Sequence, residues 1–331
     1  MDEHVKKQLI DKIESLGIRS YGFMKVNLLT SSAEYFRKRI ELGYATTFEE
    51  SEISKKIDLS TEMPNGKTIV SIAFPYHYPY EINKEGYFSM YTQGKDYHLV
   101  LKEYLEEIAG ILRDHGYEAK CLADNNALPE RYIAYVSGVG EIGRNHMLIT
   151  KEYGSKVFLG EIITDLEVET KERDFREIEN YEICGTCRNC SKACPTQIIG
   201  DIFYDTHRCM SYITQNKEVS DEDLKLFKGR LFGCDTCQLV CPWNKDLETS
   251  PLKDFEPREH MRHPNLQNLV HLSNEEFKKY KETSAGWRGK KLLQRNAMIE
   301  LMRKGRDVDE TTLGTVYLKS YYHRLKDVFK L

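Results

Sequence analysis

The sequence predicts a mixed α/β fold in its first half, a cysteine-rich segment after it and a short helical segment at the end. Stretches rich in β-branched and aromatic residues alternate with helical stretches up to about residue 170. Eight of the nine cysteines follow between residues 183 and 245, and helix-forming sequence returns beyond residue 250. With 331 residues, 40% of them hydrophobic, the chain can bury a core in one large domain or two to three smaller ones.

The expected strands of the first part are Tyr21–Val26, Thr68–Phe74, Glu118–Asp124 and Val157–Val168. The expected helices between them are Ser32–Leu42, Asp96–His115 and Pro129–Val136, the last opened by its proline. The acidic segment Glu169–Glu182 is expected to be a solvated linker or loop. Helices are expected again at Glu275–Lys281, Lys290–Arg303 and Thr311–Phe329. These elements suggest domains at residues 1–170, 171–250 and 251–331.

Composition points to a cytoplasmic protein with no membrane association. No run approaches eighteen apolar residues, and the charged, amphipathic start lacks the apolar stretch of a secretory signal. Nine cysteines without an export signal are not expected to form a disulfide framework. The net charge of −4 argues against a globally basic nucleic-acid-binding surface, although a local one remains possible.

The cysteines follow the spacing of bacterial ferredoxins. The first run is Cys184-x2-Cys187-x2-Cys190-x3-Cys194-Pro195, in which three thiolates hold one [4Fe-4S] cluster and the fourth reaches a second cluster. Two intervening residues allow a tight turn to direct successive thiolates at one cube. The run therefore predicts a ferredoxin-like domain with two clusters.

A second run, Cys234-x2-Cys237-x3-Cys241-Pro242, has one cysteine fewer, and Cys209 supplies the missing thiolate. We expect the first cluster to be held by Cys184, Cys187, Cys190 and Cys241, and the second by Cys194, Cys209, Cys234 and Cys237. The alternatives are structural zinc, which commonly uses well-separated CxxC pairs, and loose thiols. Cys121 lies outside both runs and is expected to be a small buried hydrophobe.

Two other motifs are incomplete. Gly138–Gly143 formally reads GxGxxG, but a dinucleotide site needs a preceding strand, and the preceding stretch reads as a helix. Asp96–Leu101 begins like the D-x-H-x-x-G loop by which some corrinoid proteins give a histidine to cobalt, but Leu101 stands where glycine is needed. We expect neither site.

The segment Phe232–Lys245 resembles the signature of epoxyqueuosine reductase, which completes queuosine synthesis in tRNA. The resemblance continues in order over roughly residues 20–300 and includes five further stretches. These are Pro75-Tyr76, Tyr91–His98, Asp124 followed by Pro129–Arg131, Gly138–Asn145, and Gly154–Asp165. It implies a mixed α/β cobalamin-binding domain, no protein histidine on cobalt, and two clusters that pass electrons one at a time to cobalt. The implied product is queuosine, formed from the epoxide with loss of water.

The resemblance implies that Asp124 is the proton donor. From the residues alone, Asp124 ends a candidate strand and opens an Asp-Asn-Asn turn, so capping the following helix is the alternative. Tyr97 and His98 are candidates for the same pocket. The remaining predicted cofactor contacts are Arg144, Asn145, Ser155 and Leu159. Reduced flavodoxin or ferredoxin is the expected electron donor, and the expected state is a monomer.

The C-terminal segment is a candidate contact for a tRNA anticodon arm. Residues 274–331 contain fourteen Lys or Arg against eight Asp or Glu. Within it, the predicted RNA contacts are Arg288, Lys290, Lys291 and Arg295. Many family members continue with further HEAT-like helix pairs, whereas this chain has about one. A related corrinoid and iron–sulfur reductase acting on another substrate, and a plain two-cluster electron carrier, therefore remain alternatives.

Overall fold

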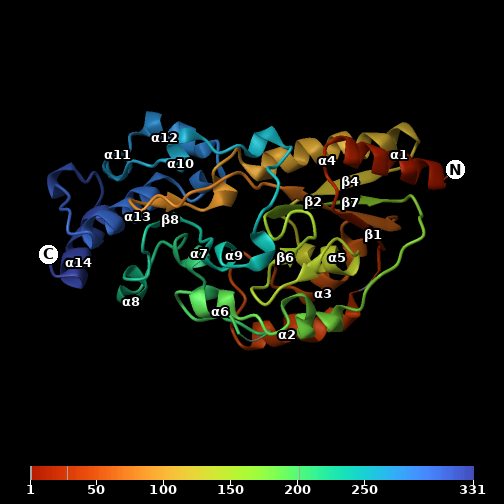
Figure 1. Cartoon of the computed structure of the whole chain (residues 1–331), viewed down its shortest axis with the longest axis horizontal. Helices are drawn as coiled ribbons and strands as arrows, with labels where there is room; N and C mark the ends of the chain where they lie inside the picture. Colours follow the sequence, from red (N-terminus) through yellow and green to blue (C-terminus); the bar gives the residue numbers. More distant parts are fainter. Residues whose placement is uncertain (1, 28, 201) are drawn as a thin grey trace. The chain divides into compact units, whose positions relative to one another are not determined.

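A computed structural model describes residues 2–27, 29–200 and 202–331 (Figure 1). The chain forms two compact units from interleaved segments. The first unit contains residues 1–77, 98–206 and 237–253, and the second contains residues 78–97, 207–236 and 254–331. The sequence suggested three consecutive domains, whereas these two units alternate along the chain. The chain returns to the first unit twice and ends in the second.

A four-stranded antiparallel sheet forms the centre of the first unit. Its order is β1-β2-β7-β4, with strands β1 (Tyr21–Lys25), β2 (Thr68–Pro75), β7 (Val157–Thr164) and β4 (Ala119–Leu122). All four predicted strands are present, and every residue of β2 is buried. Because β4 ends at Leu122, Asp124 lies in the loop that follows it.

Helices cover both faces of this sheet (Figure 1). On one face, α4 (Tyr97–Asp114) brings Leu105 against Gly160, and Glu107 of α4 pairs with Lys12 of α1 (Asp2–Ser15). On the other face, α5 (Glu130–Val136) shares a core with Met24, Ile69 and Ile163. The other helices of this unit are α2 (Ala33–Glu41), α3 (Ile53–Ile57) and α6 (Asn189–Ala193).

The glycine motif at residues 138–143 connects α5 to a hairpin of β5 (Glu141–Ile142) and β6 (Leu148–Ile149). It follows a helix, as the sequence indicated, so it lacks the strand that a dinucleotide fingerprint requires. The acidic segment that follows β7 is not wholly solvated. It contains a 3₁₀ helix at Phe175–Asn180, and the side chains of Phe175, Ile178 and Tyr181 join the core. The prediction of an exposed linker is therefore wrong at these three residues.

The second unit is mainly helical. Strands β3 (Tyr87–Phe88) and β8 (Arg230–Phe232) pair in parallel. Helix α13 (Lys290–Arg303) is buried along its whole length from Leu292 to Met302, because α11, α14 and β8 pack around it. The helices of this unit are α7 (Met210–Ile213), α8 (Asp221–Leu224), α10 (Glu259–Arg262), α11 (Leu266–Val270), α12 (Asn274–Lys281), α13 and α14 (Val316–Phe329).

Helix α9 (Thr236–Leu239) spans the boundary between two chain segments. Thr236 is the last residue of a segment of the second unit, and the rest of the helix belongs to the segment 237–253 of the first unit.

In the described part of the chain, no helix combines the length and the apolar character needed to cross a lipid bilayer.

Candidate functional site

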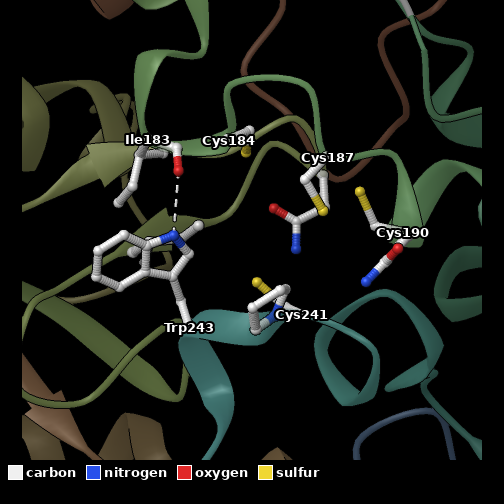
Figure 2. A pocket seen from close by; sticks show the side chains of 10 residues that line it. Ile183, Cys184, Cys187, Cys190, Cys241 and Trp243 are labelled. Atoms are coloured by element: carbon white, nitrogen blue, oxygen red, sulfur yellow. Dashed lines mark hydrogen bonds between the residues drawn. The ribbon is translucent and has the colours of Figure 1, made fainter.

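Four cysteines from two distant stretches of the sequence surround one cavity in the first unit. Cys184, Cys187, Cys190 and Cys241 line a cavity of about 230 Å³. Figure 2 shows their sulfur atoms around a common space, with Cys241 facing the three cysteines of the first run. This is the set that the spacing predicted for the first cluster, including the crossover of Cys241.

Local structure explains why these thiols converge. Cys184 ends a 3₁₀ turn, Gly185 takes φ +48°, and the N–H of Cys187 donates to the carbonyl of Cys184 at 2.9 Å. Cys190 is carried by the short helix α6, and Cys241 precedes the 3₁₀ turn that Pro242 opens. The turns reverse the chain between successive cysteines, so each sulfur can reach the same volume.

Protein groups complete the wall of the cavity. The Trp243 indole N–H donates to the carbonyl of Ile183 at 3.1 Å, which fixes the two stretches together (Figure 2). The backbone N–H of Arg144 donates to Cys184 Sγ at 3.3 Å. All nine cysteines lie among the described residues, and none of them forms a disulfide bond there. Four free thiols around one cavity, with an N–H donor to sulfur, suit a [4Fe-4S] cluster.

The other four cysteines are divided between the two units. Cys194 and Cys237 belong to the first unit, and Cys209 and Cys234 belong to the second. Their assignment to a second cluster stays a prediction. Within the second unit, buried Arg230 donates its Nε–H to Cys234 Sγ at 3.2 Å, and its other N–H groups bind the carbonyls of Leu226 and Phe227. Sequence spacing could not identify Arg230.

A second group of polar side chains lies at the ends of α4 and β4. His98 Nε2 lies 2.9 Å from Asp124 Oδ2, and the side chains are 26% and 48% exposed. Asp124 takes φ +54°, a left-handed backbone conformation that aspartate tolerates better than most residues. The structure therefore brings the predicted proton donor and His98 together. Tyr97, the residue before His98, belongs to the other unit, where its ring contacts that of Tyr91.

Two further carboxyl groups, those of Glu130 and Glu161, interact with Asp124 or with each other. The backbone N–H of Asp124 donates to Glu130 Oε1 at 2.5 Å. Burial and the nearby charge of Asp124 raise the pKa of Glu130 to about 7. Glu161, on β7, is fully buried, accepts a hydrogen bond from Ser71 Oγ at 3.2 Å, and has its pKa raised well above the ordinary range by burial and by Glu130. Sequence analysis missed both glutamates, although Glu130 stands in the segment that follows Asp124.

The four remaining predicted cofactor contacts are Arg144, Asn145, Ser155 and Leu159. Arg144 and Asn145 are each 8% exposed, and Arg144 Nε and Asn145 Nδ2 have no hydrogen-bond partner among the described residues. Unpaired buried donors are costly, so acceptors of a bound group would fit here. Ser155 is buried, and its N–H donates to Asn244 Oδ1 at 2.8 Å. Leu159 lies on β7 and is partly buried. All four remain predictions.

The predicted RNA contacts have different environments in the second unit. Lys291 is exposed, Lys290 is partly exposed and binds Asn274 Oδ1, and Arg288 donates to the carbonyl of Gln215. Arg295, in contrast, is 0% exposed. Its guanidinium donates to the carbonyls of Asn216, Lys217 and Thr214 and to Asn296 Oδ1. The prediction that Arg295 contacts RNA is corrected, because this guanidinium is used inside the core.

We expect Arg295→Ala to destabilise the protein rather than to affect RNA binding directly. The change removes the donor to the Asn216 carbonyl and leaves a cavity beside the Tyr321 ring, over which the guanidinium lies at 5.3 Å, so the free energy of unfolding should fall by about 3 kcal/mol. Chemical denaturation of this variant and of Lys291→Ala, a change at an exposed position of the same helix, measures the difference. A loss below about 1 kcal/mol in Arg295→Ala would contradict the structural role.

Two family models match the chain. One, for a 4Fe-4S double cluster binding domain, covers residues 183–244, and it favours iron–sulfur clusters over structural zinc for the cysteine-rich segment. The other, for epoxyqueuosine reductase QueG, DUF1730, covers residues 56–125. The first match therefore covers both cysteine runs and Cys209 between them. The second covers β2, α4 and β4, and it ends in the loop that carries Asp124.

Known proteins named epoxyqueuosine reductase align with most of the chain. The epoxyqueuosine reductase of Bacillus subtilis (strain 168) is 34% identical over 309 residues, which cover 90% of this chain and 78% of that protein. That of Atelocyanobacterium thalassa is 30% identical over 309 residues, covering 88% of this chain and 99% of that protein. A protein that aligns with this chain over nearly its whole length is therefore named epoxyqueuosine reductase.

Solved structures have the same fold. A crystal structure of epoxyqueuosine reductase with an epoxyqueuosine-modified tRNA-Tyr stem loop is 29% identical and gives a TM-score of 0.85 over 100% of both chains. A structure of the Bacillus subtilis enzyme with its catalytic aspartate loop swung out of the active site is 30% identical and gives 0.86, over 99% of this chain and 91% of that one. On this similarity of sequence and fold, the chain belongs to the epoxyqueuosine reductase family.

Proposed function

We propose that this protein reduces epoxyqueuosine in tRNA to queuosine. The observation that carries the proposal is the Asp124 carboxyl, held at His98 on a loop of the same unit that contains the four-cysteine cavity. A solved relative has a catalytic aspartate on a loop, and another is bound to an epoxyqueuosine-modified stem loop. The family therefore supplies the reaction, and the proposal gives the role of that loop aspartate to Asp124.

The reaction requires a proton donor at the epoxide oxygen. Replacing the epoxide by a double bond consumes two electrons and two protons and releases the oxygen as water. Because hydroxide is a poor leaving group, an acid must protonate this oxygen as its bond to carbon breaks. Asp124 is half exposed and can reach a substrate, and His98 can hold its carboxyl or return a proton to it, depending on the tautomer of the imidazole.

The cofactors of the proposal are two [4Fe-4S] clusters and cobalamin. When bound, these groups would supply the two electrons, delivered one at a time. Cys184, Cys187, Cys190 and Cys241 would hold the first cluster, and Asn145 lines the same cavity. The unpaired buried donors of Arg144 and Asn145 are proposed to meet polar groups of a corrin bound next to this cavity. The proposal assigns His98 to Asp124, at 2.9 Å, and assigns no histidine to cobalt.

The proposed substrate is a tRNA anticodon arm, and the proposed contact is the basic end of the second unit. Lys290 and Lys291 lie at the start of α13, next to Trp287, which is 53% exposed. Arg288 lies over the Trp287 ring at 4.7 Å. Lysines bind phosphates, and an exposed aromatic ring offers a stacking surface for an unpaired base. Flavodoxin or ferredoxin as electron donor, a monomeric state and a cytoplasmic location belong to the same proposal.

We expect Lys290→Glu/Lys291→Glu to weaken binding of the modified stem loop. If each lysine contacts one phosphate, the slope of log affinity against log salt should decrease by about two. Fluorescence anisotropy over a salt series measures this slope. Lys225→Glu, at an exposed position of the second unit, is the control for a change of charge alone. Equal binding by the double variant and the control would place the RNA elsewhere.

The direct test is turnover. Anaerobically reconstituted protein, loaded with both cofactors and a strong reductant, should convert an epoxyqueuosine-modified stem loop into the queuosine form. Mass spectrometry of the digested RNA detects the loss of one oxygen atom. No conversion by fully loaded protein would reject the proposal. Cobalamin binding without RNA binding would favour a related reductase with another substrate, and no corrin absorbance after cobalamin addition would favour a plain electron carrier.

A further inference from the structure

The loop that carries Asp124 has few apolar contacts. It joins β4 to α5 and comprises residues 123–129, of which Leu128 alone is fully buried, while Asp124 and Asn125 are exposed. Asp124 also takes a left-handed backbone conformation, at φ +54°. Because hydrophobic burial contributes little to this segment, its position depends on polar contacts.

One oxygen atom accepts two hydrogen bonds from the loop. Glu130 Oε1 accepts the backbone N–H of Asp124 at 2.5 Å and Asn126 Nδ2 at 3.0 Å. Asn126 Oδ1 in turn accepts the N–H of Leu128 at 2.8 Å. Glu130 is the first residue of α5, and residues 132–136 of this helix are packed in the core, so the accepting carboxyl has a fixed base.

These contacts fix the direction of the Asp124 side chain. With its N–H held by Glu130, the left-handed backbone of Asp124 presents the carboxyl to His98 Nε2 at 2.9 Å. The loop is thus held on two sides, by Glu130 at the main chain and by His98 at the side chain. If Glu130 released the N–H, the His98 contact would still hold the Asp124 side chain.

We propose that Glu130 is the positioning residue that holds the Asp124 loop in the conformation in which Asp124 meets His98. Glu130 acts through the backbone of the loop and is not a catalytic residue. Its effect on turnover rests on the proposed function, whereas its effect on the loop does not. A glutamine can supply the same accepting oxygen, an alanine cannot, and this difference separates positioning from a requirement for charge.

Hydrogen–deuterium exchange of the full chain, without RNA, tests the loop directly. In Glu130→Ala, the amides of residues 123–129 should exchange at least about tenfold faster than in the wild type, because the acceptor of the Asp124 N–H is gone. Glu130→Gln should restore most of the protection. Glu167→Gln, which changes a carboxyl that is 70% exposed at Lys67, is the matched control and should exchange as the wild type does.

Kinetics on the modified stem loop give the second readout. We expect Glu130→Ala to lower kcat at least about tenfold with little change in KM, because the donor is misplaced and RNA binding is not. Glu130→Gln should recover most of kcat. If the alanine variant does not fold, Glu130→Asp, which withdraws the oxygen by one methylene, replaces it in both measurements. The exchange result stands even if the wild type fails to reduce epoxyqueuosine, so the two proposals can fail separately.

Two results would overturn the proposal. One is wild-type exchange at residues 123–129 in the alanine or aspartate variant, which would show that other contacts hold the loop. The other is equal impairment of the alanine and glutamine variants, which would show that the charge of Glu130 matters and its hydrogen bonds do not.

Discussion

Asp124→Asn should keep both cofactors and lose most of the turnover, about 100-fold or more, as expected when a general acid is removed. The substitution preserves the size of the side chain and an oxygen that can accept a hydrogen bond from His98, which lies 2.9 Å from Asp124 in the wild type. The fold and the loop should therefore survive, while no proton is available for the departing oxygen. Single-turnover rates of reconstituted protein measure the effect.

The neighbouring residue provides the control for this variant. Asn125 is exposed in the same loop, and Asn125→Ala should turn over at close to the wild-type rate. Iron and cobalamin contents of all three proteins must agree before the rates are compared. A near-normal rate in Asp124→Asn would remove Asp124 from the mechanism and leave His98 as the next candidate for the acid.

Cys241→Ala should abolish the first cluster. Cys241 comes from the second cysteine run but shares its cavity with three cysteines of the first run. Removing one of four ligands should reduce the iron content after reconstitution from about eight to about four per chain. Turnover should fall to background, because the reaction requires electrons from the clusters.

Cys121→Ser is the matched control for the cysteine series. Cys121 lies on β4, outside both runs, and should keep the full iron content. Cys209→Ala should also halve the iron, but at the second cluster, so the two cysteine variants should retain different electron paramagnetic resonance signals. Full iron occupancy in Cys241→Ala, or identical residual signals in Cys241→Ala and Cys209→Ala, would show that the cysteines are divided differently.

Local sequence was sufficient for the elements that surround the site. The β-branched and aromatic content of Thr68–Phe74 predicted a strand, which the structure has at Thr68–Pro75. The apolar stripe of Asp96–His115 predicted a helix, which the structure has at Tyr97–Asp114. The cysteine spacing likewise predicted the crossover of Cys241, because the geometry of a cube restricts which thiols can share it.

Tertiary packing decided what the sequence could not. Arg295 has the charge of an RNA contact, but it lies on the buried central helix of its unit, and backbone carbonyls of residues 214–217 satisfy its guanidinium. Phe175 and Ile178 stand in an acidic segment that reads as solvated, yet they pack into the core. No sequence pattern marks Glu130 as the residue that holds the Asp124 loop. Its role follows from the hydrogen bond that it accepts from the backbone N–H of Asp124. Each error concerns contacts between residues far apart in the sequence or the conformation of a loop.

The most direct test of the account is a single turnover without external reductant. Protein loaded with both cofactors is reduced, separated from the reductant and mixed with epoxyqueuosine-modified stem loop, while cluster absorbance and RNA mass are followed together. The account predicts about one queuosine formed for every two electrons lost by the protein, since replacing the epoxide by a double bond consumes two electrons. Clusters that stay reduced while product forms, or that oxidise without product, would contradict it.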